Sequence, residues 1–240
     1  MEQERFYRKQ YISKDLVHFN VRVGETDLDI GARILLSKES MELIKECRRD
    51  IEGYIQEVPE FLDSLEPLAY KSDAPPIIKQ MCLAGNIAGV GPMAAVAGAI
   101  AQYVGQGLLR FSREIIVENG GDIYIKSDKE RIIGVYAGNS PLSNRIGIKV
   151  YPEVCPMGIC TSSGKVGHSL SFGHADAVIA ISHDATLADA VATAIGNRVK
   201  SIDDIQAVID SSQNIKGING LMIIMEDKLG VWGDIELVKL

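Results

Sequence analysis

The sequence predicts an α+β fold in which antiparallel sheets pack against helices. Segments with strand composition occur in runs and helical patterns gather between them, whereas a parallel βαβ architecture would alternate the two. No clear linker divides the 240 residues, and 46% of them are hydrophobic. We therefore expect residues 1–240 to form a single domain with an ample core.

The first half of the chain is predicted to begin with strands and to continue with helices. Alternating hydrophobic residues indicate two strands that are joined by a turn at 24–27. Apolar residues at helical spacing predict a helix that is capped by Ser37 or Ser40. The predicted elements are two strands within 17–36, a helix over 37–54, a proline-rich connector over 58–76, and helices over 76–85 and 93–109.

One segment of this half needs a separate test for a membrane span. No charged residue occurs between positions 80 and 109, which is long enough to cross a bilayer. Its apolar residues are mostly alanine, and its glycines and amides transfer poorly into hydrocarbon. We therefore expect a buried Gly/Ala-rich helix and no membrane span. Its small residues permit close helix packing, within one chain or between the subunits of a homo-oligomer.

The second half is predicted to contain further strands, a polar loop, two helices and a closing hairpin around Asp227-Lys228. Each strand is bounded by Gly, Asn, Asp or Ser. The predicted elements are strands over 114–118, 123–126, 132–137, 146–150 and 177–182, helices over 186–199 and 202–209, and hairpin strands over 220–225 and 230–238.

Charge and cysteine content exclude some classes of function. The net charge is −7, with a pI near 5.2 and no cluster of Lys or Arg, so we expect no nucleic-acid partner. The four cysteines contain no C-x-x-C pair, and the N-terminal ten residues contain no apolar signal region. These features predict a reduced, cytoplasmic protein.

Residues 158–174 are the most polar, glycine-rich stretch. They hold four glycines, five hydroxyl residues and two histidines, a composition that no aliphatic core segment requires. Within them, Thr161-Ser162-Ser163-Gly164 forms either an ordinary serine-rich loop or a set of N–H and hydroxyl donors for a phosphate. We interpret the stretch as a loop that converges with residues 118–122 and 188–193 on a single polar site.

Thr186-Leu-Ala-Asp189 has the form of a capping box, in which Thr186 would cap the helix and Asp189 would serve only its start. Alternatively, Asp189, Thr193 and Asn197 share one stripe of the helix. One carboxylate and one hydroxyl suit Mg²⁺ when phosphates and waters complete its shell. From spacing alone, the cap and the metal site have equal support.

Glu118-Asn-Gly120-Gly121-Asp122 interrupts two β-rich runs. The favoured interpretation is a tight hairpin turn, because Asn-Gly is a strong hairpin signal. The alternative is that the bare Gly-Gly backbone lets a ligand lie against it.

Two hydrolase alternatives also remain open. Cys155, Cys160, His168 and His174 could bind zinc, although the spacing of the histidines is atypical. The sequence around Ser169 approaches a serine-hydrolase elbow, but a strand is predicted after it where the elbow requires a helix.

The order of these motifs resembles the ApbE family of flavin transferases. Nearly the whole chain is similar, more closely, to a UPF-type family of archaeal and bacterial proteins that are distant relatives of ApbE. The segments that carry the resemblance are Gly91-Pro-Met-Ala-Ala-Val-Ala-Gly98, Glu118-Asn-Gly-Gly-Asp122, Gly158-Ile-Cys-Thr-Ser-Ser-Gly164, Gly167-His-Ser-Leu-Ser-Phe-Gly173 and Ala188-Asp-Ala-Val-Ala-Thr193.

The ApbE resemblance implies antiparallel sheets of the tandem T-fold type and transfer of FMN from FAD, with Mg²⁺, to a Thr or Ser of a partner protein. It implies that Asp189 and Thr193 bind the metal and that His168 is the catalytic base. The flavin and phosphate site would comprise Gly120, Gly121, Asp122, Thr161, Ser162, Ser163 and Gly164.

Two motifs depart from the ApbE pattern. The family's Lys-Gly-Tyr-Ala-x-Asp corresponds to Ala97-Gly-Ala-Ile-Ala-Gln102, which lacks the lysine and the aspartate. Ser169-Leu-Ser-Phe-Gly173 replaces Asp-Pro-x-Thr-Gly. The leading hypothesis is a Mg²⁺-dependent enzyme that acts on a flavin or another nucleotide and a protein acceptor. The alternative is a protein that binds a flavin or phosphorylated metabolite without transferring it.

Overall fold

The computed structural model describes residues 15–164 and 173–240, and its centre is an eight-stranded antiparallel sheet. In spatial order the strands are β1 (Val17–Val23), β2 (Thr26–Ala32), β3 (Ile115–Asn119), β4 (Asp122–Lys126), β7 (Met157–Ser162), β8 (Ala177–Ser182), β9 (Ile218–Met225) and β10 (Lys228–Gly233). A second antiparallel sheet consists of β11 (Leu237–Lys239), β6 (Ile146–Val150) and β5 (Arg131–Gly134). The predicted α+β class with antiparallel sheets is confirmed.

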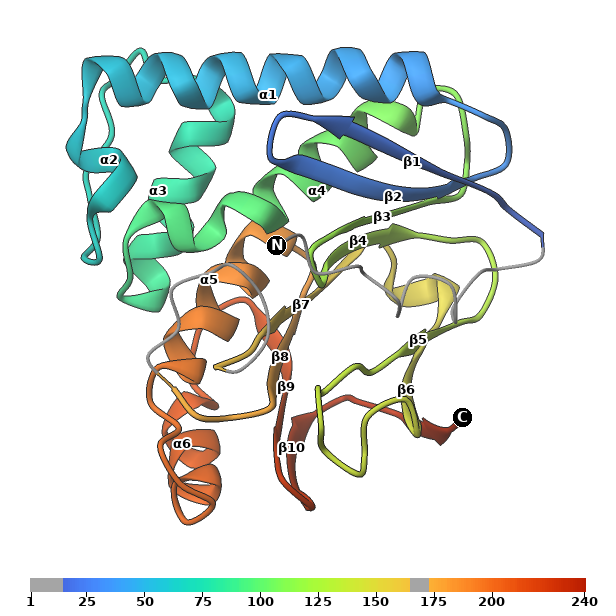
Figure 1. Cartoon of the computed structure of the whole chain (residues 1–240), viewed down its shortest axis with the longest axis vertical. Helices are drawn as coiled ribbons and strands as arrows, with labels where there is room; N and C mark the ends of the chain where they lie inside the picture. Colours follow the sequence, from blue (N-terminus) through green and yellow to red (C-terminus); the bar gives the residue numbers. More distant parts are fainter. Residues whose placement is uncertain (1–14, 165–172) are drawn as a thin grey trace.

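Helices cover one face of the large sheet, and the small sheet packs against the other (Figure 1). The helical segments are α1 (Ser37–Glu57), α2 (Glu60–Asp63), α3 (Pro76–Ala88), the 3₁₀ turn η2 (Pro92–Ala95), α4 (Val96–Leu108), α5 (Ala185–Gly196) and α6 (Asp204–Ser212). Helix α4 packs on β3 and β4, and α5 packs on β7 and β8. One hydrophobic core therefore lies between the helices and the sheet, and a second lies between the two sheets.

The small residues of α4 allow the close packing that the sequence predicts. A Cβ atom at Gly105 would lie 2.2 Å from Cδ1 of Tyr124 on β4, and one at Gly98 would lie 2.3 Å from the Ala185 carbonyl oxygen on α5. Within the described residues, no single helix is long and apolar enough to cross a membrane. Helices α3 and α4 meet that test only as a pair, and the chain bends by 103° between them.

Several predicted boundaries are wrong. Neither Ser37 nor Ser40 caps α1, because the cap position is Leu36. The Ser40 hydroxyl instead donates to the Leu36 carbonyl oxygen at 2.7 Å. The predicted polar loop is a strand in its first part, since β7 extends to Ser162. The last hairpin strand divides into β10 and β11, and β11 pairs with β6 of the small sheet.

Candidate functional site

The centre of the candidate site is Asp189 on α5, which faces the first turn of α4. Its side chain is only 8% exposed, and its Oδ2 accepts a hydrogen bond from the Gly98 N–H at 2.8 Å. The N–H groups in the first turn of a helix have no partner within the helix, so the carboxylate satisfies one of them from outside. This approach requires glycine, because a Cβ at Gly98 would lie 2.7 Å from Cβ of Asp189.

The predicted capping box is wrong, because the N-cap of α5 is Asp184. Its Oδ1 accepts hydrogen bonds from the N–H groups of Thr186 at 2.9 Å and Leu187 at 3.3 Å. The Thr186 hydroxyl is buried without a hydrogen-bond partner among the described residues. Asp189 is bonded to a neighbouring helix, so its role extends beyond the start of its own helix.

Gln102 on α4 holds the start of α5 in return. Its Oε1 accepts the Ala185 N–H at 2.6 Å, and its Nε2 donates to Asp184 Oδ1 at 3.1 Å. The side chain is 4% exposed. Sequence reasoning missed this contact, although an amide among the apolar positions of an alanine-rich helix is a signal that a buried polar partner is present.

A second buried carboxyl group, that of Asp122, lies near Asp189. Its Oδ1 accepts the Thr161 N–H at 3.1 Å. Burial raises the pKa of Asp122 well above its usual range, and the charge of Asp189 raises it further. Burial also raises the pKa of Asp189. Ionising both of these neighbouring buried carboxyl groups is costly in free energy. We therefore expect one of them to hold a proton, or a cation to lie beside them.

Cys160, on β7, is the buried thiol beside these carboxyl groups. Its Sγ lies 3.3 Å from the Ala185 carbonyl oxygen, within hydrogen-bond range. Burial raises the pKa of Cys160, and the charges of Asp122 and Asp189 raise it further. The thiol therefore remains protonated and is a poor nucleophile.

The turn between β3 and β4 lies at the same end of α4. Gly120 and Gly121 have φ values of 70° and 107°, as a two-residue hairpin turn requires. The Gly121 N–H donates to Glu118 Oε1 at 2.7 Å, and the Asn119 amide donates to the Ala97 carbonyl oxygen at 3.1 Å. The hairpin interpretation is thus confirmed, and the turn is held beside the N-terminal end of α4.

The serine-rich segment is partly strand and partly connector. Thr161 and the buried Ser162 belong to β7, while the half-buried Ser163 and exposed Gly164 follow it. The Gly164 N–H donates to the Ala175 carbonyl oxygen at 3.1 Å. Because the Thr161 and Gly164 amides donate inside the protein, side-chain hydroxyls are the better candidates for phosphate donors.

Glycines join this segment to the C-terminal end of α5. A Cβ at Gly164 would lie 2.0 Å from the Gly173 carbonyl oxygen, and one at Gly173 would lie 1.8 Å from that of Gly196. Gly196 is within one helical turn of Thr193, which is half-buried. Gly164 therefore lies near the C-terminal end of the helix that carries Asp189 and Thr193. The predicted base His168 and the elbow residue Ser169 lie outside the described residues.

The described residues contain no group of three or more His, Cys, Asp and Glu side chains that could hold a metal ion. Two of the four residues predicted as possible zinc ligands have other partners. Cys160 faces the Ala185 carbonyl oxygen, and Nδ1 of the exposed His174 lies 2.9 Å from the Lys200 carbonyl oxygen. The described members thus do not form a zinc site. A cation at Asp189 would also need oxygen ligands from a bound molecule or water.

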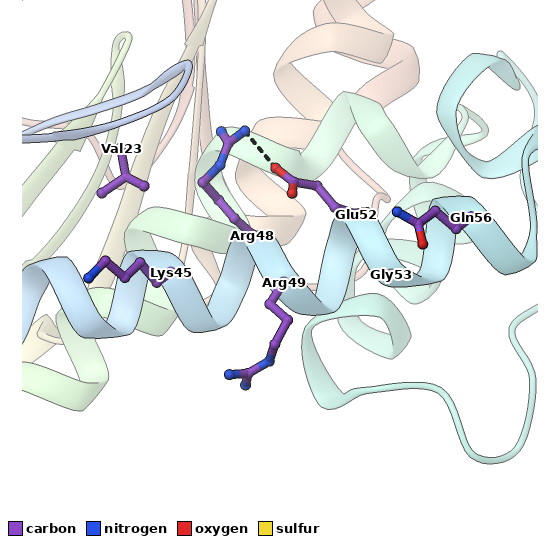
Figure 2. A pocket seen from close by; sticks show the side chains of 7 residues that line it. All are labelled: Val23, Lys45, Arg48, Arg49, Glu52, Gly53 and Gln56. Atoms are coloured by element: carbon purple, nitrogen blue, oxygen red, sulfur yellow. Dashed lines mark ion pairs between the residues drawn. The ribbon is translucent and has the colours of Figure 1, made fainter.

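An open cavity of about 410 Å³ lies elsewhere, between the outer face of α1 and the end of β1 (Figure 2). Arg48 in its wall pairs with both Glu25 and Glu52 at 2.6 Å, and Lys45 pairs with Glu42 at 3.0 Å. Its lining residues are Val23, Lys45, Arg48, Arg49, Glu52, Gly53 and Gln56. None of them belongs to the convergent polar segments, so we do not place the candidate site there.

Comparisons with known proteins show the family of this chain and its fold. A family model described as "AbpE bacteria" matches residues 8–226. The chain is 41% identical to a UPF0280 protein of Methanococcus aeolicus, with 93% of each chain covered. It is 44% identical to a UPF0280 protein of Methanocaldococcus jannaschii, with 84% of each covered.

The fold is similar to that of solved ApbE proteins. For the flavin transferase ApbE from Vibrio cholerae, the TM-score is 0.57 at 14% identity, covering 90% of this chain and 96% of that one. For the ApbE protein from Thermotoga maritima, the TM-score is 0.57 at 15% identity, with the same coverage. The predicted ApbE-like fold is thereby confirmed.

Proposed function

The chain belongs to the UPF0280 family and has the fold of the ApbE proteins, and on this basis we propose that it binds a flavin or related nucleotide together with Mg²⁺. We propose further that it catalyses an FMN-transferase type of reaction on a protein hydroxyl. The observation that carries the proposal is the buried, poorly compensated carboxylate of Asp189, placed where α4, the Gly-Gly turn and the serine-rich segment meet.

The residues present fit a magnesium ion. Asp189 and Thr193 offer hard oxygen ligands on successive turns of α5, and Asp122 adds negative charge nearby. The protein supplies too few ligands to enclose the ion, so phosphate oxygens of the nucleotide and water would complete the shell. When bound, the metal would neutralise phosphate charge during transfer.

The remaining groups have complementary roles in this proposal. The backbone of Gly120 and Gly121 provides a surface without side chains, against which a ligand can lie. The hydroxyls of Ser162 and Ser163 would donate to the phosphate. His168 would accept the proton of the acceptor hydroxyl. The hydroxyl oxygen would then bond to the FMN phosphorus of FAD, while the bond from that phosphorus to AMP breaks and AMP leaves.

The test is a titration with FAD, followed by flavin fluorescence, with and without Mg²⁺. Asp189→Asn keeps an oxygen to accept the Gly98 N–H but removes the charge, so the folded variant should lose Mg²⁺-dependent binding. Asp210→Asn, at an exposed position of α6, makes the same change in charge and should bind normally. Equal binding of FAD by the wild-type protein and both variants, or binding that does not depend on Mg²⁺, would contradict the proposal.

A second candidate function is flavin or metabolite binding without transfer. It is favoured by Ala97 and Gln102, which stand where the ApbE motif has lysine and aspartate, and by the engagement of Gln102 with α5. Incubation with FAD, Mg²⁺ and a threonine-containing acceptor protein, followed by mass spectrometry, separates the two. Binding without an FMN adduct on the acceptor would favour the second function.

A further inference from the structure

We propose that Gln102 is a positioning residue, which sets the placement of Asp189 and Thr193 by fixing the start of α5 against α4. The expected effect of Gln102 on metal binding rests on the proposed function, whereas its hydrogen bonds to α5 do not. The two hydrogen bonds of the Gln102 amide go to Ala185 and Asp184, and it acts on the site through them.

The two helices are antiparallel and are tied together twice. Gly98 and Gln102 are four residues apart on α4, and Ala185 and Asp189 are four residues apart on α5. Each tie uses an N–H from the first turn of one helix and a side-chain oxygen from the other. A shift of α5 by a fraction of a turn would break both.

The start of α5 is also fixed from the other side. Asp184 donates its N–H to Ser182 Oγ at 3.0 Å, and the Ser182 hydroxyl donates to the Gly217 carbonyl oxygen at 2.7 Å. A Cβ at Gly158 would lie 2.3 Å from Cα of Ala185, so β7 leaves no room behind the helix. Gln102 thus completes a connection from the strands, through α5, to α4.

Only an amide suits position 102 in this arrangement. Its oxygen accepts the Ala185 N–H while its nitrogen donates to the Asp184 carboxylate. A carboxylate would accept the first hydrogen bond but would repel Asp184. Gln102, which stands where the ApbE motif has aspartate, is therefore suited to hold α5 in place.

The experiment uses amide hydrogen exchange, so that it does not depend on ligand binding. In Gln102→Glu, protection of the Ala185 and Gly98 amides should fall together, by about ten-fold. When Gln102→Glu is combined with Asp184→Asn, the repulsion between the two carboxylates is removed, while the asparagine oxygen can still accept the Thr186 N–H, and protection should recover. Gln106→Glu, at an exposed position of α4, is the control. Loss of protection at Ala185 with an unchanged Gly98 would overturn the proposal, as would absence of recovery.

The functional consequence is tested with Mn²⁺ as a spectroscopic probe in the presence of FAD. Affinity should fall about ten-fold in Gln102→Glu and return to within about two-fold in the double variant. An unchanged affinity in a folded Gln102→Glu protein would overturn the functional part. If the wild-type protein binds no Mn²⁺, the proposed function fails, whereas hydrogen exchange still decides the positioning role.

Discussion

The Asp189 carboxylate accepts the Gly98 N–H at 2.8 Å, so the residue that we propose as a metal ligand is also part of the interface between two helices. The two roles do not exclude each other, because a carboxylate has two oxygens and about four acceptor sites. They do affect the choice of variant, since removing the side chain alters both roles, while an amide alters mainly the charge.

Asp189→Ala should destabilise the protein, and Asp189→Asn should do so much less. Alanine leaves the buried Gly98 N–H without an acceptor, at a cost of about 1–3 kcal/mol in the free energy of unfolding. Asparagine keeps an acceptor oxygen. Urea unfolding at neutral pH measures the difference, and equal stabilities of the two variants would show that the hydrogen bond does not matter.

Gly105→Ala should be more destabilising than a glycine replacement elsewhere in the helices. The new Cβ would lie 2.2 Å from Cδ1 of buried Tyr124, so α4 or the ring must move, at a cost of roughly 1–3 kcal/mol. Gly53→Ala in α1 meets nothing within 4 Å and should stabilise by about 0.5–1 kcal/mol. Thermal unfolding should therefore move in opposite directions for the two variants.

The sequence was sufficient for the fold class and for most elements. Strands such as β6 and β8 were predicted to the residue, because their apolar runs end at unambiguous turn residues. The predicted loop at β7 was wrong because Gly158 and Ser162 are typical turn residues, and pairing with the neighbouring strands overrides that preference.

The site could be predicted only in part. Asp189 and the Gly-Gly turn stood out from local spacing, but the Gly98 N–H that Asp189 accepts is 91 residues away in the chain. Asp184 was missed as the N-cap because Thr186, two residues later, is also a residue type that commonly caps helices. The tie between Gln102 and α5 spans 83 residues, and no local pattern encodes it.

Glu114 should make the protein sensitive to acid. Burial alone would raise the pKa of Glu114, but hydrogen bonds from Ser127, Arg131 and Arg33 outweigh it and lower the pKa from 4.5 to about 2. A carboxyl group with a depressed pKa stabilises the fold fully above its unfolded value, and this contribution is lost as the pH falls toward its folded value. The free energy of unfolding should therefore fall between about pH 4.5 and 2.

Glu114→Gln is the variant that isolates this effect. It cannot ionise, so its unfolding free energy should depend less on pH than that of the wild-type protein over this interval. Urea unfolding at about pH 6, 4 and 3 measures both slopes. Parallel slopes would mean that the carboxyl groups of other residues cause the acid sensitivity.

Asp122→Asn should stabilise the ligand-free protein while weakening the binding of a cation. Its amide oxygen can still accept the Thr161 N–H, and one of two mutually repelling buried carboxylates is removed. The gain should be roughly 1 kcal/mol at a pH where both groups would otherwise be ionised. The same loss of charge should weaken Mn²⁺ binding several-fold, because less negative charge faces the ion. Asp227→Asn, in the exposed turn between β9 and β10, makes the same change in net charge and should alter neither quantity. Stabilisation without loss of Mn²⁺ affinity would place the cation away from Asp122.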